Sequence, residues 1–216
     1  QYGDREGRLL VGSLSPLQDQ VFVQVSGREE IYLVTSEFLR FLPRVGNDWR
    51  DTTLADLKHL VFNRLVLTNG NRTLLFHREG TTDSWNINAR SLEARADNPK
   101  LNHLLEELAL LRFNEFVSDN PKADLGRFGL DTPDLTLVFA QEDKNLLTLN
   151  FGRSPTNDET VVYARRADTM SVGLIAKEAL AGWRGTLEDF RDRHLVNLPA
   201  NSVDEVERYG TSSFTL

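Results

Sequence analysis

Histidine is the side chain of this sequence with the widest range of chemistry, since it can hold a metal ion or move a proton near neutral pH. The sequence has four histidines, which are dispersed along the chain: His59, His77, His103 and His194. Only two have a carboxylate at helical spacing: Asp56 precedes His59, and Glu106 and Glu107 follow His103. A metal site needs several converging ligands, and no His-Glu-x-x-His motif is present. The spacing therefore favours solvated polar faces, and we expect neither a metal nor another cofactor.

The sequence also lacks the patterns that surround catalytic nucleophiles and bound phosphates. Cysteine is absent, which removes thiolate chemistry, disulfides and Cys-ligated metals. Ser15-Pro16 and Ser154-Pro155 have no Gly-x-Ser-x-Gly elbow around them, so we interpret them as turn initiators. Gly126 and Gly129 belong to no Gly-x-Gly-x-x-Gly or P-loop pattern. We predict that the protein is not an enzyme, and a hydrolase is the least favoured alternative.

Two Arg-Asp pairs and one tryptophan remain as candidates for ligand binding. Arg50 and Arg191 each precede an aspartate, and a guanidinium oriented by a carboxylate can clamp an anion. The competing interpretation is a structural ion pair or cap, which is favoured because the pair occurs twice. Trp183 follows Gly182 near an expected loop, so it is a better candidate for a partner surface than Trp49 or Trp85, although core packing is favoured for all three tryptophans.

The Arg-Asp pairs belong to a longer internal repeat. Three features recur in the same order at an offset of 139 to 141 residues: Gly12 with Gly152, Ser15-Pro16 with Ser154-Pro155, and Trp49-Arg50-Asp51 with Phe190-Arg191-Asp192. Residues 21–23 align with residues 161–163, and Gly70, Leu74 and Phe76 align with Gly210, Phe214 and Leu216. This period is longer than that of solenoids, which repeat every ~20 to 50 residues, so it indicates two copies of a domain-sized unit.

The repeat predicts where the chain is organised into domains. We assign residues 1–80 to the C-terminal part of a first repeat unit and residues 81–216 to a second, more complete unit. The first copy has no counterpart of residues 85–146, and residue 1 is Gln rather than Met. We therefore expect that an N-terminal part has been removed, and such a part could hold a signal or an anchor.

Local patterns predict an α+β fold with largely antiparallel sheets and helices packed on one face. Residues 20–25 with 31–34, and 135–140 with 146–151, have the pattern of β-hairpins, and residues 64–67, 73–77 and 84–88 that of a meander. Leucines at helical spacing predict a helix from Asn98-Pro99 to Phe116. Shorter helices are expected from Thr35 or Ser36 to Leu42, and within residues 174–183.

Composition excludes several classes of partner. The chain has 32 acidic and 25 basic residues and a net charge of -7, which disfavours nucleic acid and a basic membrane-binding face. Its 40% of hydrophobic residues is enough for a genuine core. No apolar run approaches the ~18 residues that a membrane-spanning helix needs.

These features together resemble a bacterial family, the domain of unknown function 4340. The resemblance is carried by the repeated Gly and Ser-Pro positions before each hairpin, by the Trp/Phe-Arg-Asp segments, and by residues 127–133, which are similar to the family's Tyr-Gly-Leu-Asp-Pro-Pro turn. Phe128 and Thr132 depart from that turn. The resemblance implies a periplasmic or extracytoplasmic protein, membrane-anchored in its full-length form and sometimes encoded beside ABC transporters of the gliding-motility type. It implies no known reaction.

Two hypotheses of function follow. The first is a non-enzymatic interaction module that binds a partner protein, such as a membrane transporter subunit, through a sheet edge or a groove between the units. The second is a domain that binds a small molecule or carbohydrate between the two units, with Arg50, Arg191 and Trp183 as ligand-binding residues.

Overall fold

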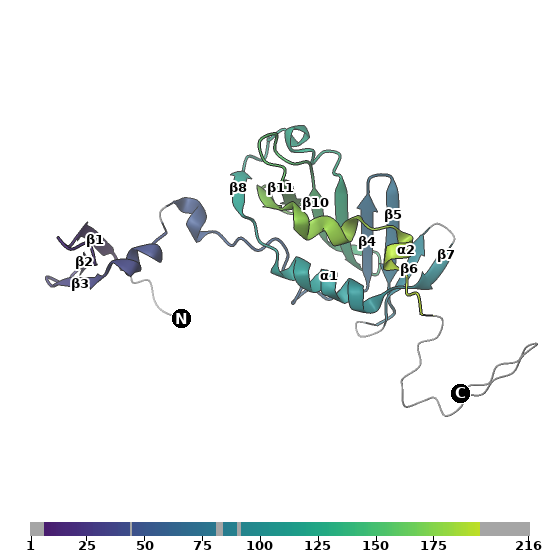
Figure 1. The fold of residues 1–216 in the computed structure, drawn as a ribbon, viewed down its shortest axis with the longest axis horizontal. Coiled ribbons are helices and arrows are strands. Elements are labelled where there is room, and N and C mark those ends of the chain that lie inside the picture. Colours follow the sequence, from purple (N-terminus) through teal and green to yellow (C-terminus); the bar gives the residue numbers. More distant parts are fainter. Residues whose placement is uncertain (1–6, 44, 81–83, 90–91, 195–216) are drawn as a thin grey trace, which may run out of the picture. The chain divides into compact units, whose positions relative to one another are not determined.

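A computed structural model describes residues 7–43, 45–80, 84–89 and 92–194 of the chain. The chain divides into two compact units, residues 1–51 (unit 1) and residues 52–216 (unit 2). The ribbon in Figure 1 shows unit 1 in purple and blue and unit 2 from blue to yellow. Each unit is described by itself below.

Unit 1 is built on a three-stranded antiparallel meander. Its strands are β1 (Leu9–Leu14), β2 (Gln20–Val25) and β3 (Ile31–Thr35), in the order β1-β2-β3. The predicted hairpin of β2 and β3 is confirmed, and Gly27, with φ of 85°, supplies the left-handed residue of its turn. Two short 3-10 helices follow, η1 (Ser36–Arg40) and η2 (Gly46–Trp49). The helix expected after Thr35 is therefore a single 3-10 segment, and no side chain caps it.

Unit 2 contains a nine-stranded sheet in the order β7-β6-β5-β4-β9-β10-β11-β12-β8. All its strand pairs are antiparallel, and the strands are β4 (Arg64–Asn69), β5 (Arg72–His77), β6 (Asn86–Ala89), β7 (Leu92–Arg95), β8 (Glu115–Ser118), β9 (Leu135–Gln141), β10 (Lys144–Phe151), β11 (Val161–Arg166) and β12 (Val172–Ala176). The predicted meander over residues 64–88 and the hairpin of β9 and β10 are confirmed. Antiparallel sheets with few helices make this an α+β fold.

The long helix α1 (Asn98–Leu110) begins at the predicted residue but ends earlier than predicted. Its N-cap is Asp97, whose carboxylate accepts the backbone N–H of Lys100 at 3.1 Å, while the Asn98 side chain accepts the N–H of Trp85 at 2.7 Å. The predicted extension to Phe116 is wrong, because residues 115–118 form β8 and pair with β12. Sheet hydrogen bonds prevail here over the leucine periodicity.

The shorter helices complete unit 2. The segment predicted as helix over residues 174–183 is divided between the end of β12 and the 3-10 helix η4 (Lys177–Arg184). Two further short helices are η3 (Leu125–Phe128) and α2 (Leu187–Phe190). The core joins leucines of α1 to the sheet and to Trp85, Trp183 and Phe190. Among the described residues, no helix is long and apolar enough to cross a membrane.

The internal repeat is visible in the hydrogen bonds of the two meanders, β1–β3 (meander 1) and β10–β12 (meander 2). Val11 pairs with Val23 as Phe151 pairs with Ala164, and Val21 pairs with Val34 as Val162 pairs with Ile175. The N–H of Ser36 donates to Asp19 as that of Lys177 donates to Thr160, each at 2.8 Å. The counterpart of Val21 is therefore Val162 and not Val161, so the sequence alignment was wrong by one residue there.

The division into compact units lies between residues 51 and 52, whereas the repeat assigns residues up to 80 to the first copy. The two boundaries differ because of β4 and β5. The repeat assigns these strands to the first copy, but in the structure they belong to the nine-stranded sheet of unit 2. Every residue of β4 pairs with β9. The counterparts expected for Gly70, Leu74 and Phe76, namely Gly210, Phe214 and Leu216, lie outside the described residues.

The two copies also begin their last short helix in the same way. Asp189 in α2 accepts the backbone N–H and the hydroxyl of Thr186, each at 2.8 Å, and Asp48 accepts the N–H of Val45 at 3.1 Å. The backbone and hydroxyl bonds from Thr186 lower the pKa of Asp189 below its usual 3.8, with smaller contributions from Lys100 and Arg193. Bonds of this kind favour the ionised carboxyl group.

We expect the Asp189→Asn variant to be less stable than the wild type at neutral pH, and this difference to shrink as the pH falls. Because the folded state lowers the pKa of Asp189, its contribution is fully present above the unfolded pKa and is lost as the pH falls through the folded pKa, below 3.8. Urea unfolding of both proteins across the acid range measures the difference. A gap that stays constant to the lowest pH would contradict this role.

Candidate functional site

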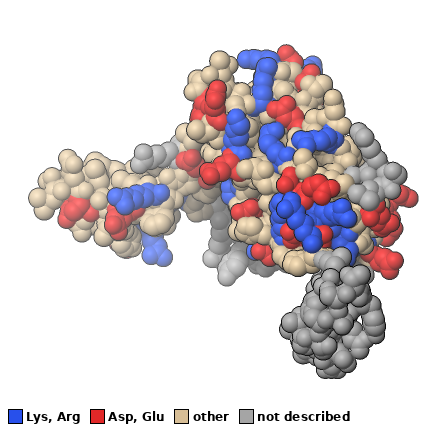
Figure 2. Space-filling view, turned by 45° about the vertical axis from the view of Figure 1, so that its right-hand side comes forward, with Lys and Arg blue, Asp and Glu red and all other residues tan. Residues whose placement is uncertain are grey.

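Large hydrophobic side chains are exposed mainly on unit 1. Of the fifteen exposed large hydrophobic residues in the described part of the chain, eleven belong to unit 1: Leu9, Leu10, Val11, Leu14, Leu17, Ile31, Tyr32, Leu33, Phe41, Val45 and Trp49. The visible side of unit 1 in Figure 2 carries few charged side chains, whereas acidic and basic side chains are interspersed over unit 2. Exposed apolar patches are typical of surfaces that bind other molecules, so unit 1 is the first place to look for a candidate site.

One face of meander 1 corresponds to the core face of meander 2. Leu9 and Val11 in β1 are 44% and 40% exposed, whereas their counterparts in β10, Leu149 and Phe151, are both 0% exposed. Val21 and Val23 in the central strand are buried, as their counterparts Val162 and Ala164 are. The first copy therefore keeps the apolar pattern of a core face, but its outer strand remains open to solvent.

In the part of the chain that the structure describes, both edges of meander 1 also lack a further strand. In unit 2, β10 pairs with β9 on its outer side, and β12 pairs with β8. Within the described residues, β1 and β3 each pair with β2 alone. An open edge presents unpaired backbone N–H and C=O groups that can accept another strand. We name the core-equivalent face and the two open edges together the meander 1 surface.

Arg50, one of the predicted ligand-binding residues, lies directly after η2. Its Nη1 atom donates to Oδ1 of Asn47 at 3.3 Å, and its backbone N–H donates to the carbonyl of Asn47 at 3.1 Å. These contacts are local and connect Arg50 to η2. They are the contacts of a structural cap.

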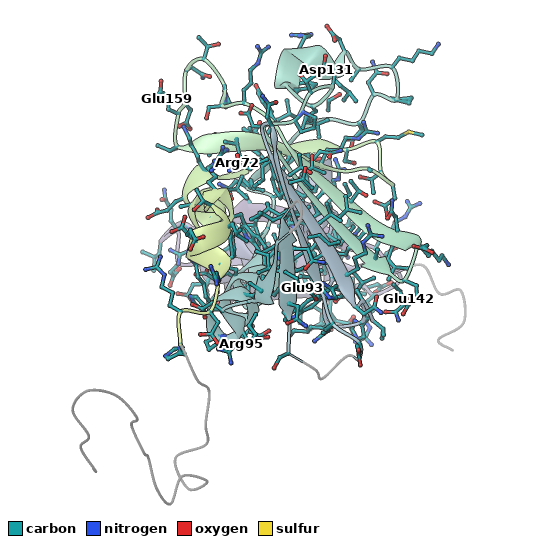
Figure 3. All side chains as sticks on the ribbon, turned by 90° about the vertical axis from the view of Figure 1, so that its right-hand side faces the viewer. Arg72, Glu93, Arg95, Asp131, Glu142 and Glu159 are labelled. Carbon is teal, nitrogen blue, oxygen red and sulfur yellow. The ribbon has the colours of Figure 1, made fainter. Side chains whose placement is uncertain are left out.

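Arg191, its counterpart, lies beside β7 in unit 2. Its backbone forms a bridge with Ala96, and its exposed side chain lines a hollow of about 500 Å³ with Arg95, Asp192 and His194. Asp192 does not orient Arg191. It accepts the N–H of His194 at 2.9 Å and forms an ion pair with Arg95 at 3.5 Å. Figure 3 shows Arg95 and Glu93 at the end of the sheet opposite Asp131 and Glu159.

We expect the Arg191→Ala variant to unfold within about 0.5 kcal/mol of the wild type, because no hydrogen bond or ion pair of this side chain is found in the described part of unit 2. Arg95→Ala is the matched comparison. It removes a bond to the carbonyl of His194 at 2.6 Å and the ion pair with Asp192. Its side chain is half-exposed, so we expect a loss of a few tenths to about 1 kcal/mol. Urea unfolding measures both, and a larger loss for Arg191→Ala would contradict the assignment.

Trp183 is a core residue and not part of a surface. It is 1% exposed and belongs to the same buried cluster as Leu104 and Leu180. Trp85 is equally buried, as predicted. Trp49 departs from the expected packing, because it is 77% exposed while its counterpart Phe190 is 1% exposed. The structure therefore offers no ligand contact for Trp183.

His59 and His103 have the local contacts expected of a polar surface, whereas Nε2 of His77 lies 3.3 Å from Oε1 of Glu93 on another strand. The Nδ1 atom of His59 lies 2.7 Å from Oδ2 of Asp56, and Nε2 of His103 lies 3.4 Å from Oε1 of Glu107. No group of three or more potential metal ligands is found in the described part of the chain.

The surface residues that sequence reasoning missed are Leu9, Val11, Tyr32 and Phe41. A signal for two of them was present in the repeat, since Tyr32 and Phe41 stand at the positions of Gly173 and Gly182. A large aromatic in place of a glycine at equivalent positions indicates that the two copies pack against different neighbours.

A model of the family described as Domain of unknown function (DUF4340) matches the chain twice, over residues 2–117 and residues 85–216. No curated protein and no solved structure matches the chain. The two matches overlap and together extend over nearly the whole sequence. With two segments of this family that follow one another along its length, the chain belongs to the DUF4340 family.

Proposed function

We propose that this protein is a non-enzymatic interaction module that binds a partner protein through the meander 1 surface. The observation that supports it is the difference between the two copies. Leu9 and Val11 are exposed where Leu149 and Phe151 are fully buried, although Val11 pairs with Val23 as Phe151 pairs with Ala164. Burial of apolar side chains is the main favourable contribution to association, at ~25 cal/mol per Å².

The open edges of β1 and β3 suit protein recognition better than small-molecule binding. Addition of a strand supplies main-chain hydrogen bonds along its whole length, and side chains on alternate positions provide selectivity. The net charge of -7 is unfavourable for nucleic acid. A polypeptide is therefore the partner that fits both the edges and the apolar face.

The cellular setting that we propose follows from the family resemblance. In this setting the protein lies in the periplasmic or extracytoplasmic space of a bacterium, is held to the membrane in its full-length form, and acts as an accessory to an ABC-type transporter. The partner on the meander 1 surface would then be a subunit of that transporter.

Site-specific photo-crosslinking in the native organism tests this function. A photoreactive benzoylphenylalanine replaces Tyr32 or Phe41 in unit 1, and Met170, which is 59% exposed in unit 2, is the control position. We expect cross-links to one defined protein from positions 32 and 41 and none to it from position 170. Equal cross-linking from all three positions, or none from unit 1, would overturn the proposal.

A second function, small-molecule binding, is favoured by one cavity in unit 2. A hollow of about 520 Å³ lies beside α1 and is lined by apolar side chains such as Leu57, Phe62 and Leu105, with Lys58 and Arg78 among its polar residues. The Arg78 guanidinium stacks 4.3 Å from the Trp85 ring. This arrangement suits a ligand with an apolar body and an anionic group. A thermal-shift screen of such compounds, repeated with the Lys58→Ala variant, tests this function. We expect Lys58→Ala to reduce the increase in melting temperature that a bound compound causes. An equal increase in the variant and the wild type would count against binding in this cavity.

A further inference from the structure

We infer that unit 2 has an anion site, in which Lys177 and Arg184 bind the phosphomonoester group of a small phosphorylated polyol. The site lies in a hollow lined by η4 and by the loop that joins β10 to β11. This hollow is separate from the meander 1 surface and from the cavity beside α1. The inference therefore goes beyond the function proposed above and does not depend on it.

Two segments of unit 2 supply the hydrogen-bond donors of this hollow, which has a volume of about 630 Å³. The loop after β10 contributes Arg153, Ser154 and Thr156, and η4 contributes Lys177 and Arg184. Three positive charges and two hydroxyl groups therefore line one space. Arginine, lysine and hydroxyl side chains are common partners of phosphate, whose terminal oxygens accept hydrogen bonds from several directions.

The two cations of η4 are available to a ligand. In the described residues, neither the Lys177 ammonium nor the Arg184 guanidinium forms a hydrogen bond or an ion pair, although Asp134 and Glu159 line the same hollow. Arg184 is fixed through its backbone instead, because its carbonyl oxygen accepts Nδ2 of Asn69 at 3.1 Å. The position of η4 is thus set by main-chain contacts, and its charged side chains remain for binding.

Arg153 has a different part in the hollow. Its Nε and Nη2 atoms donate to the carbonyl oxygen of Arg127 at 3.1 and 2.6 Å. These bonds hold the beginning of the loop after β10 against the turn of residues 125–129. Arg153 therefore adds positive charge to the hollow, while its position is fixed by the fold.

The internal repeat offers a comparison with a place that lacks these charges. The counterparts of the three cations in the first copy are all uncharged: Ser36 for Lys177, Pro43 for Arg184 and Ser13 for Arg153. Meander 1 nevertheless forms three antiparallel strands as meander 2 does. The strands do not require the cations, and their convergence on one hollow in the second copy favours ligand binding.

The two carboxylates of the hollow indicate what the rest of the ligand is. Asp134 and Glu159 line the same space as the cations, and Figure 3 shows Glu159 at the end of the sheet away from Arg95. Carboxylates accept hydrogen bonds from hydroxyl groups, so they suit a polyol next to the phosphate. The volume lies within the range of ~300–1,000 Å³ that is typical of small-molecule sites.

Calorimetric titration of the full chain with glycerol 3-phosphate, and with glycerol for comparison, tests the site. We expect saturable binding of glycerol 3-phosphate and none of glycerol. Lys177→Ser, which introduces the residue of the first copy, and Arg184→Gln should each weaken binding roughly tenfold, since loss of one charge-assisted bond of ~1.4 kcal/mol changes affinity by that factor. Lys177→Arg retains the charge and should retain binding.

Lys144→Ala is the matched control, because it removes an equal charge elsewhere in unit 2. Lys144 lies in the hairpin of β9 and β10 with Glu142, which Figure 3 shows at the other end of the sheet from Glu159. We expect Lys144→Ala to bind glycerol 3-phosphate as the wild type does. Urea unfolding of every variant verifies that it is folded.

Sedimentation with vesicles distinguishes a lipid headgroup from a soluble phosphomonoester. The vesicles consist of phosphatidylcholine with or without phosphatidic acid, which carries the same phosphomonoester group. Binding to phosphatidic acid alone assigns the site to a lipid, and binding to glycerol 3-phosphate alone assigns it to a soluble compound. In either case Lys177→Ser and Arg184→Gln must reduce the binding.

The inference is overturned if neither glycerol 3-phosphate nor phosphatidic acid binds. It is also overturned if folded Lys177→Ser and Arg184→Gln variants bind as the wild type does, or if Lys144→Ala weakens binding to the same extent. Cross-linking from positions 32 and 41 involves none of these residues. A failure of the anion site therefore leaves the proposed function standing, and a failure of cross-linking leaves the anion site standing.

Discussion

The Phe190→Ala variant should lose about 3–5 kcal/mol of unfolding free energy, the usual cost of removing a buried phenylalanine. Phe190 is 1% exposed, and its ring packs edge-on against Phe76 at 5.3 Å between centroids. The Lys100 ammonium lies 5.2 Å from the centroid of the same ring. Removal of the ring therefore leaves a cavity and also breaks an aromatic pair and a cation–π contact.

Trp49→Ala is the control that the repeat supplies. Trp49 occupies the equivalent position at the end of η2, but it is 77% exposed. We expect the unfolding free energy to change by no more than about 0.5 kcal/mol. Urea unfolding followed by circular dichroism suits both variants, because it does not depend on tryptophan fluorescence. Similar losses in the two variants would show that Trp49 is packed as Phe190 is, and would remove the contrast on which the meander 1 surface depends.

Sequence reasoning was most successful where a local signal and the tertiary structure agree. Between the predicted strands of residues 64–67 and 73–77, Asn69, Gly70 and Asn71 are typical turn residues, and Gly70 has the positive φ of 56° that such a turn requires. The strands on either side of it were found for the same reason. The antiparallel sheets of the fold class could thus be predicted from hairpin patterns alone.

The errors have identifiable physical causes. The leucine pattern of α1 continues past Leu110, but β12 offers an open edge to residues 115–118, and sheet pairing ends the helix. The alignment of Val21 with Val161 is wrong by one residue. Such a shift places two aligned residues on opposite faces of their strands, and the sequence around them fits either alignment. The strand register decides for Val162, because Val162 pairs with Ile175 as Val21 pairs with Val34.

The candidate site was harder to predict than the fold. Arg50, Arg191 and Trp183 were chosen by residue type. Arg50 has the local hydrogen bonds to Asn47 given above, and Trp183 lies in the core. In the described part of unit 2, no side-chain hydrogen bond or ion pair of Arg191 is found. The surface that we propose for binding consists largely of aliphatic side chains, and no residue type separates these from a core. The proposal depends on the exposure of Leu9 and Val11 compared with the burial of their counterparts.

The Gly152→Ala variant should lose about 1–3 kcal/mol of unfolding free energy, the usual cost of overpacking, or more. A Cβ atom at this position would lie 2.1 Å from the carbonyl oxygen of Phe128 and 3.0 Å from the carbonyl carbon and oxygen of Gly129. All three are backbone atoms, so no side chain can rotate away. Gly129 has φ of 68° in the left-handed region, which restricts how this turn can move.

Gly12→Ala tests the same position in the first copy, where the nearest atoms to an added Cβ are Cβ and O of Phe22, both at 3.4 Å. This is close to ordinary van der Waals contact, and φ of Gly12 is not positive. We expect a change between zero and a gain of about 0.4–1 kcal/mol, because alanine reduces the entropy of the unfolded chain. The urea concentrations at which half of each variant is unfolded measure the difference in stability between Gly12→Ala and Gly152→Ala. If Gly152→Ala is as stable as Gly12→Ala, the turn of residues 125–129 does not lie against the backbone at Gly152. If Gly152→Ala is much less stable, the close contact with this turn occurs in the second copy alone. Packing then requires a glycine at position 152 but not at position 12.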